Sequence, residues 1–275
     1  YQLRKSSWRP EYFLYIHRTP ALTAMTIATL DELSNGRMFL ALGNGVRSWM
    51  ENQGVNFKKT TTAMEEYIRI VRRLLLGELV TYKGEFYDLN EVKLTMKILR
   101  SSIPIYVATM GKKMFQLAGK VADGAFVGAG CYAPSYIKWA RENMKIGAKK
   151  AGRRAQDTQL AAYVITSVSK DHNKAKESAK TSVAYLLAMD CFDPILEIMG
   201  LTMEEVTPTR KAWYSGNFKE AYARVTDGML DASAIYGTPE ECAKRMHVFR
   251  SAGVDLPVIM PVGDIKETIE FAKEW

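Results

Sequence analysis

The stretch that most constrains this chain runs from residue 103 to residue 132, IPIYVATMGKKMFQLAGKVADGAFVGAGCY. It predicts a buried strand over 103–109, a short helix over 112–121 and a second buried strand over 124–128. Two parallel strands joined by a helix are the repeating unit of α/β folds. A glycine turn follows each strand, and α/β proteins bind their ligands at the carboxyl ends of strands. The sequence therefore predicts that the working face lies at these two turns.

The rest of the chain extends this alternation of strands and helices. Strands are expected at 37–43, 103–109, 124–128, 159–168 and 256–262, with YFLYI at 12–16 as a candidate for one more. Helices are expected at 20–33, 62–76, 112–121, 134–150, 173–199 with a break at Asp193-Pro194, 239–252 and 264–275. Residues 46–60 are expected to form a long loop, 82–87 a hairpin, and 200–237 an insertion of short helices. This pattern suits a doubly wound sheet or part of a (β/α)8 barrel. No GxGxxG or P-loop follows the first strand, which favours the barrel.

Three helix starts carry capping signals: Thr19 before Pro20, Thr62 with Glu65, and Thr238 with Pro239 and Glu241. The first of these helices places Leu22, Met25, Thr29 and Leu33 on one face. Each of the three ends near a glycine, as helices commonly do. These signals fix helix positions but carry no chemistry.

The composition is that of a globular enzyme-sized chain. It has 275 residues, 47% hydrophobic and 25% charged, with no apolar run near the ~20 residues that a membrane span needs. No signal-peptide pattern is visible. The cysteines Cys131, Cys191 and Cys242 and the histidines His17, His172 and His247 are scattered, so neither a disulfide framework nor a metal site is expected. Odd, dispersed cysteines favour a reducing cytoplasm.

The net charge of +8 has two explanations. The densest basic cluster, Lys149-Lys150 with Arg153-Arg154, falls near a predicted helix end, where cations complement the helix dipole. The alternative is an anionic cofactor or substrate. No strip of basic and aromatic residues indicates nucleic-acid binding.

Several segments resemble the bacterial luciferase-like superfamily. They are RTPALTA at 18–24, LDELSNGR at 30–37, LGNG at 42–45, the 82–86 segment, 103–111 and ADG at 122–124. Within that superfamily, FDPI at 192–195, IMGL at 198–201, VTD at 225–227, GTPEE at 237–241 and GV at 253–254 are similar to the methylenetetrahydromethanopterin reductase family. The resemblance implies a (β/α)8 TIM barrel that binds a flavin or a 5-deazaflavin.

The resemblance also implies a function. It is hydride transfer from reduced coenzyme F-420 (F420, an 8-hydroxy-5-deazaflavin) to methylenetetrahydromethanopterin, a step of archaeal one-carbon metabolism and methanogenesis. The implied partner is a small-molecule pterin, with a homo-oligomeric assembly and no nucleic acid or membrane. Two alternatives stay open: an FMN-dependent luciferase-like monooxygenase, with FMN as cofactor, and a non-catalytic flavin-binding barrel fragment.

Candidate cofactor-binding residues follow from the same resemblance. Ala108, Thr109, Met110 and Gly111 match the family segment that lies along the coenzyme ring and its tail. Gly128, Ala129, Gly130 and Cys131 match a turn near the coenzyme phosphate, where backbone N–H groups can hold an anion. Gly43, Asn44 and Gly45 form a third glycine turn, for which turn geometry alone is an equally good explanation.

In the family, about two βα units and a third strand precede the RTPALTA segment, whereas here nineteen residues precede Pro20. The expectation is a single partial barrel domain over 1–275, lacking its first two to three strands, with the 200–237 insertion before the last βα unit. The acidic residue proposed to assist catalysis in the family falls in the preceding segment. No catalytic residue is therefore assigned in this sequence.

Overall fold

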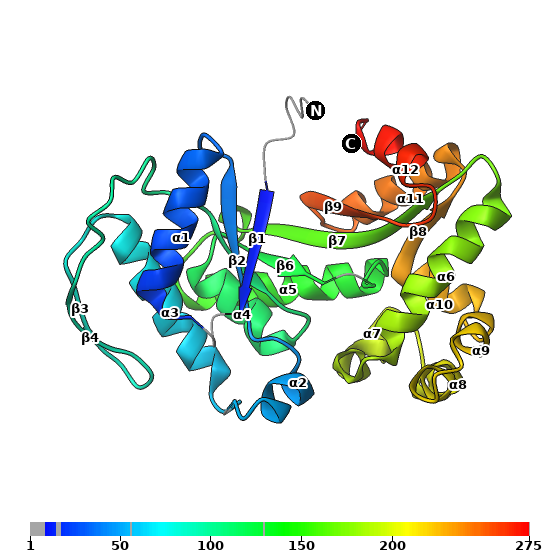
Figure 1. Ribbon diagram of the computed structural model, residues 1–275, viewed down its shortest axis with the longest axis horizontal. Helices are drawn as coiled ribbons and strands as arrows, with labels where there is room; N and C mark the ends of the chain where they lie inside the picture. The colour runs from blue at the N-terminus through cyan, green and yellow to red at the C-terminus, as the bar shows by residue number, and fades with distance from the viewer. Residues whose placement is uncertain (1–8, 15–17, 56, 129, 275) are drawn as a thin grey trace. The chain divides into compact units, whose positions relative to one another are not determined.

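The computed structural model describes residues 9–14, 18–55, 57–128 and 130–274. The chain divides into two compact units, 1–126 with 143–158 and 127–142 with 159–275. We call them the first and the second unit. Each is built from parallel strands with helices between them, which confirms the α/β class (Figure 1). None of the described helices has the length and the apolar character that crossing a bilayer requires.

The strands of the first unit lie in the order β1 (Arg9–Leu14), β2 (Met38–Gly43), β5 (Ile105–Ala108) and β6 (Gly124–Val127), all parallel. Every residue of β2 and β6 is buried, as their unbroken apolar runs predict for parallel strands. The strand expected at 12–16 is instead found at 9–14; residues 15–17 lie outside the described part.

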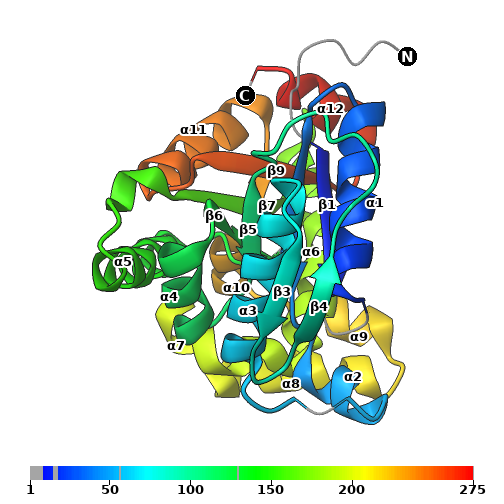
Figure 2. The same ribbon diagram turned by 90° about the vertical axis from the view of Figure 1, so that its left-hand side faces the viewer.

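The helices of the first unit are α1 (Pro20–Leu33), α2 (Arg47–Asn52), α3 (Thr60–Leu75), α4 (Lys112–Val121) and the end of α5 (Pro134–Lys150), with the short η2 (Ala155–Asp157) after it. Helix α3 packs against both α1 and α4 (Figure 2). The expected loop at 46–60 was partly wrong, because it contains α2. Gly119 and Gly147 let α4 and α5 touch backbone to backbone: a Cβ would lie 2.0 Å from the Met144 oxygen and 1.8 Å from the Gln116 oxygen, respectively.

Helix α1 begins as its sequence predicts but buries a different face. The Thr19 hydroxyl accepts the Leu22 N–H at 3.2 Å, which confirms the cap. Leu22, Met25 and Leu33, on the apolar face read from the sequence, are 42%, 46% and 78% exposed. The buried face carries Thr23, Ala24, Ile27, Ala28 and Asp31. Small side chains face inward because α1 packs closely on both β2 and α3.

Helix α3 does not use the predicted capping box. It begins at Thr60, two residues earlier than expected, and no side chain caps its N-terminus. Glu65 instead pairs with Arg69 and with Lys120, both at 2.8 Å. The prediction was wrong because the helix starts before Thr62, which therefore lies inside it and cannot be its N-cap.

The predicted hairpin is confirmed and longer than expected. Strands β3 (Val80–Lys83) and β4 (Asp88–Val92) pair antiparallel beside α3 (Figure 2). The Glu66 carboxylate of α3 accepts the N–H groups of Glu85, Phe86 and Tyr87 at 2.8, 3.0 and 3.2 Å. This carboxylate therefore holds the hairpin turn against the helix.

In the second unit, β7 (Gln159–Val168) lies between β8 (Ala234–Gly237) and β9 (Leu256–Pro261), all parallel. Strand β8 corrects the expectation that 200–237 is wholly an insertion of short helices. Its four residues, AIYG, are all buried. The strand was missed because an apolar run of four residues fits a helix as well as a strand.

The helical segments of the second unit are α6 (His172–Ala188), η3 (Asp190–Ile195), α7 (Leu196–Met199), α8 (Met203–Tyr214), α9 (Phe218–Ala223), α10 (Asp227–Ser233), α11 (Pro239–Ser251) and α12 (Ile265–Ala272). The break expected at Asp193-Pro194 is confirmed by η3. The capping box of Thr238 and Glu241 at the start of α11 is also confirmed.

Candidate functional site

The carboxyl ends of β2 and β5 bring two of the predicted glycine turns together in the first unit. The two strands are neighbours, and their register pairs Gly43 with Ala108. The turn Gly43-Asn44-Gly45 and the segment Thr109–Gly111 therefore leave the same edge of the sheet. The sequence predicted a working face at strand ends, and here two of its candidate segments lie side by side.

Asn44 is the one side chain in its turn that offers polar groups. Its Oδ1 atom is buried and has no hydrogen-bond partner among the described residues. Buried polar atoms in folded proteins are nearly always paired, so an unpaired one needs an explanation. A ligand donor at this edge would provide one.

The segment after β5 presents backbone rather than side chains. The Thr109 N–H donates to the Phe126 carbonyl at 3.0 Å, and the Thr109 hydroxyl accepts the Gly111 N–H at 3.0 Å. Gly111 precedes α4, and no side chain caps that helix. A Cβ at Gly111 would meet nothing nearer than the Thr109 hydroxyl at 4.0 Å, so the space beside it is open. A flat ligand can approach the backbone here.

The third predicted turn, in the second unit, is packed more tightly. Gly128 is half-buried, Ala129 lies outside the described residues, and Gly130 and Cys131 are buried. A Cβ at Gly130 would lie 3.1 Å from both Leu186 and Phe192. Burial raises the pKa of the Cys131 thiol, so it stays protonated. Coenzyme contact at this turn stays a prediction.

The other cysteines are equally unreactive by their surroundings. Cys131, Cys191 and Cys242, all among the described residues, form no disulfide. Burial raises the pKa of Cys191 to about 11 and that of Cys242 to about 12. Thiolates are the reactive form, so neither is a nucleophile at neutral pH. The described residues also contain no cluster of three or more His, Cys, Asp and Glu side chains placed to hold a metal ion.

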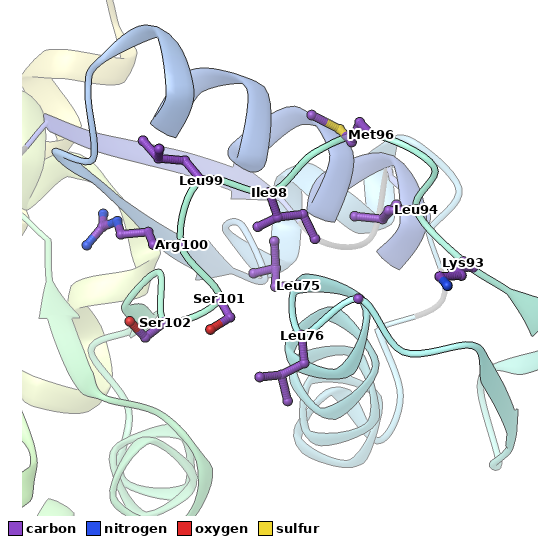
Figure 3. Close-up of a pocket in the computed structure, with 11 residues that line it drawn as sticks. Leu75, Leu76, Lys93, Leu94, Met96, Ile98, Leu99, Arg100, Ser101 and Ser102 are labelled. Carbon is purple, nitrogen blue, oxygen red and sulfur yellow. The ribbon is translucent and has the colours of Figure 1, made fainter.

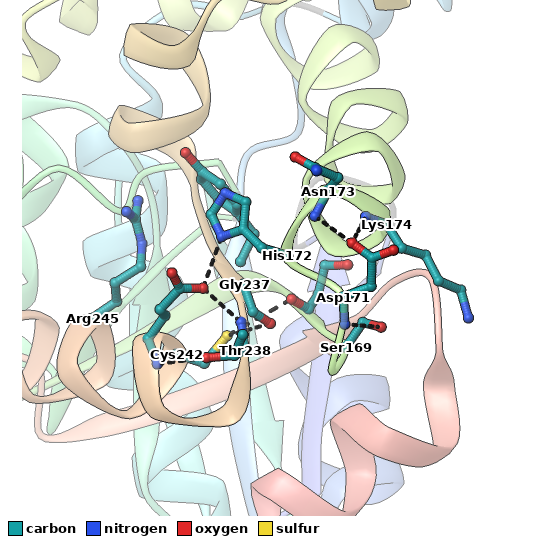
Figure 4. Close-up of polar contacts among 12 residues, drawn as sticks. Ser169, Asp171, His172, Asn173, Lys174, Gly237, Thr238, Cys242 and Arg245 are labelled. Atoms are coloured by element: carbon teal, nitrogen blue, oxygen red, sulfur yellow. Dashed lines mark hydrogen bonds and ion pairs between the residues drawn. The ribbon is translucent and has the colours of Figure 1, made fainter.

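The carboxyl ends of β7 and β8 carry a polar network that the sequence did not reveal (Figure 4). His172 Nδ1 lies 2.8 Å from Glu241 Oε2, and the same oxygen accepts the Thr238 N–H at 2.8 Å. These hydrogen bonds, His172 first, hold the pKa of Glu241 below its ordinary value. Gly237 must be glycine, because its φ is +129° and a Cβ would lie 2.3 Å from Glu241 Oε2.

A second part of this network surrounds Tyr236. Its hydroxyl donates to Asp231 at 2.9 Å, and Arg245 Nη1 lies 3.0 Å from the same carboxylate oxygen. The Arg245 guanidinium also lies 4.7 Å from the Tyr236 ring centre and 5.1 Å from that of Tyr132. Burial and the Asp231 hydrogen bond raise the pKa of Tyr236. The sequence signal for this network is the set of charged residues at 231, 241 and 245, which flank β8. It was missed because β8 was not recognised as a strand.

Most of the chain matches a known protein family. A family described as luciferase-like monooxygenase matches residues 13–256. The chain belongs to this family. The resemblance of the sequence segments is thereby confirmed.

The relatives of this luciferase-like protein include two archaeal enzymes. It is 36% identical over 260 residues to the 5,10-methylenetetrahydromethanopterin reductase of Archaeoglobus fulgidus, covering 92% of this chain and 77% of the relative. It is 35% identical over 252 residues to the reductase of the same name from Methanolobus tindarius, covering 91% and 76%.

Solved structures agree. The coenzyme F420-dependent tetrahydromethanopterin reductase of Methanopyrus kandleri matches with a TM-score of 0.84 and 29% identity, over 93% of this chain and 78% of that one. An F420-dependent secondary alcohol dehydrogenase in complex with an F420–acetone adduct matches with a TM-score of 0.72 over 94% and 74%; at 23% identity it shows the fold alone. This luciferase-like chain is thus an oxidoreductase of that family.

One further cavity in the first unit is not a good candidate for the active site (Figure 3). Its volume is about 530 Å3. It is lined by residues 75–77 at the end of α3 and by eight of the residues between Lys93 and Ser102, which precede β5. It therefore lies toward the amino end of that strand, whereas α/β enzymes work at the carboxyl ends. Its Arg100 is already paired with the buried Asp31, at 2.7 Å.

Proposed function

We propose that this luciferase-like protein transfers a hydride between reduced coenzyme F420 and the one-carbon unit of methylenetetrahydromethanopterin. The observation that carries the proposal is the meeting of the Gly43–Gly45 turn with the Thr109–Gly111 segment at one edge of β2 and β5. The named relatives supply the substrate and the coenzyme as hypotheses.

The residues at this edge fit a flat cofactor. Gly111 leaves open space beside the backbone, and the buried, unpaired Asn44 Oδ1 can accept a hydrogen bond from a ring N–H. Ala108, Thr109 and Met110 are half-buried, so they can cover one face of a ring and still contact it. When bound, a reduced 5-deazaflavin supplies the hydride from C5.

The task of the protein is then to orient and to shield. Hydride transfer needs two reacting carbons held face to face, and fixed positioning of this kind contributes much of an enzyme's acceleration. The backbone of 108–111 would fix the ring plane, and the uncapped start of α4 would hold a negative group with its N–H donors. No catalytic acid or base is assigned to a side chain.

The proposal extends to the architecture and the setting. The match to the Methanopyrus reductase supports a barrel of the luciferase-like (β/α)8 type, with 1–275 as a single domain. A homo-oligomeric state and a cytoplasmic location are part of the same proposal.

The test is a binding titration followed by turnover. The purified protein is titrated with F420 and, separately, with FMN, and the ring absorbance and fluorescence are followed. We expect micromolar or tighter binding of F420 and none of FMN, then oxidation of reduced F420 when methylenetetrahydromethanopterin is added. Binding of FMN alone would replace the proposal with the monooxygenase alternative. F420 binding without turnover would favour a non-catalytic binding protein.

A further inference from the structure

A second cavity of the first unit has a wall of unusual charge. Its volume is about 580 Å3, and it is lined by Arg47, Phe57, Lys58, Lys59, Glu85 and Phe86. The lining thus combines three cationic side chains, one carboxylate and two aromatic rings. The residues come from the start of α2, the segment before α3, and the turn of the β3–β4 hairpin.

The existing ion pairs leave this cavity positive. Lys59 Nζ lies 2.5 Å from Glu85, and Arg47 Nη1 lies 3.2 Å from Glu51. All four side chains are about half-exposed or more, and such surface pairs contribute little energy. Lys58 is exposed and has no ion-pair partner among the described residues. The Arg47 guanidinium is also placed 4.9 Å from the Phe57 ring centre, which orients it.

The start of α3 makes the same region more positive. Lys59 precedes the helix with φ of 49°, no side chain caps it, and its first turn has no acidic residue. A helix N-terminus carries a partial positive charge that anions stabilise and lysines destabilise. Helices α8 and α11 begin instead with complete capping boxes. The arrangement before α3 costs stability in the free protein, and a bound anion would reverse that cost.

Helix α2, which contributes Arg47 to the cavity wall, lies next to the glycine edge already described. Arg47 follows the Gly43–Gly45 turn by two residues, and Met50 of the same helix lies 3.0 Å from where a Gly45 Cβ would be. Phe57 and Phe86 add apolar wall to the cationic one. This combination suits an anionic group carried on an organic chain better than a free inorganic ion.

We propose that this pocket of Arg47, Lys58 and Lys59 binds the anionic carboxylate chain of the ligand whose ring occupies the neighbouring glycine turns. The identity of that ligand rests on the proposed function, but the preference for an anion rests on the pocket itself. Two ligands of the proposed reaction could supply the chain: the coenzyme or the pterin.

The experiment compares Lys58→Gln and Arg47→Gln with Lys97→Gln. Lys97 is an exposed lysine of the same unit outside the pocket, so it controls for the loss of one charge. Each protein is titrated with intact F420 and with the tail-less deazaflavin nucleoside. We expect the Kd for intact F420 to rise about tenfold in the two pocket variants, because each variant loses one hydrogen bond to a charged group. The Kd for the tail-less ring should stay unchanged.

A second arm separates the two sources of the chain. If the Kd for F420 is unchanged but KM for methylenetetrahydromethanopterin rises about tenfold, the pocket holds the pterin's chain; either result supports the site. The proposal is overturned if intact and tail-less coenzyme weaken by the same factor, if Lys97→Gln acts as strongly, or if no constant changes.

A third measurement does not depend on the proposed reaction. Triglutamate is added to each protein and the thermal midpoint is followed. We expect it to raise the wild-type midpoint and to have less effect on Lys58→Gln, while Lys58→Gln alone should be slightly more stable without ligand. If F420 does not bind but triglutamate still stabilises, the proposed function fails and the pocket stands. If F420 binds and triglutamate stabilises all variants equally, the pocket fails and the function stands.

Discussion

The carboxyl-end edges of the two units are built in opposite ways. At β2 and β5 of the first unit, Gly111 has open space beside its backbone, and Asn44 Oδ1 has no partner among the described residues. At β7 and β8 of the second unit, His172, Glu241 and Thr238 bind one another. The first edge leaves backbone open to a ligand, whereas the second is occupied by a side-chain network, in which Ser167 Oγ and Arg245 Nε are also buried without a partner among the described residues.

The two edges also differ in charge. The cavity of about 580 Å3 in the first unit has three cations. A cavity of about 690 Å3 in the second unit is lined by the acidic Glu240, Asp264, Glu267, Glu270 and Glu274 against Lys170 and Lys266. An anionic ligand is therefore favoured in the cavity of the first unit and repelled in that of the second. The overall charge of +8 would not have revealed this division.

The largest effect is expected away from both edges, at the amino end of β2. Asp31 is 1% exposed, accepts the Met38 N–H at 3.0 Å and pairs with Arg100. Asp31→Ala should lower the free energy of unfolding by about 3 kcal/mol, because it leaves the guanidinium without its buried partner. Urea unfolding followed by circular dichroism measures it. The exposed neighbour variant Glu32→Ala is the control, and equal effects of the two would show that β2 is not anchored here.

The next effect sharpens the description of the receptive edge. Glu66→Gln weakens three hydrogen bonds to the hairpin turn that carries Glu85 and Phe86. We expect a loss of about 2 kcal/mol in unfolding free energy, since bonds to a buried carboxylate are among the stronger ones. Glu65→Gln, which breaks more exposed ion pairs in the same helix, should cost less than about 1 kcal/mol. The reverse order would remove the turn as a fixed wall of the cavity.

A third variant tests the receptive edge directly. Gly111→Ala places a methyl group in open space, so the thermal midpoint should not change, while the Kd for F420 should rise about tenfold (~1.4 kcal/mol) by steric exclusion. Gly228→Ala is the matched control, because its Cβ would likewise meet only a threonine hydroxyl, at 3.8 Å. Unchanged F420 affinity in Gly111→Ala would place the ring elsewhere.

The smallest effect concerns the second edge and its dependence on pH. Glu241 and Glu205 each close a capping box, and hydrogen bonds hold the pKa of each below the ordinary 4.5. A carboxyl with a lowered folded-state pKa adds stability above pH 4.5 that is lost as the pH falls. Glu241→Gln should lower the thermal midpoint at pH 7 by about 2 °C and flatten its fall below pH 4.5. Glu205→Gln should do less, because Glu205 lacks the histidine partner; equal curves would mean that His172 contributes nothing.

The sequence determined what depends on neighbours along the chain. Helix starts at Thr19 and Thr238 were predictable, because a cap is made within four residues. The turn after β5 and the helix α4 were predictable for the same reason. The segments at 18–45, 82–86, 103–111 and 122–124 also identified the luciferase-like family, which the match over 13–256 confirms.

Tertiary structure decided what depends on distant residues. The contacts of α1 with α3 and β2 decide which face of α1 is buried. Glu65, predicted to close a capping box, instead pairs with Lys120, fifty-five residues away. Strand β8 is formed by pairing with β7, and its four residues alone do not predict a strand. The site itself depends on the register of β2 with β5, which sets Gly43 beside Ala108 across sixty-five positions of sequence. Hydrogen bonds between strands fix that meeting, and no local pattern encodes it.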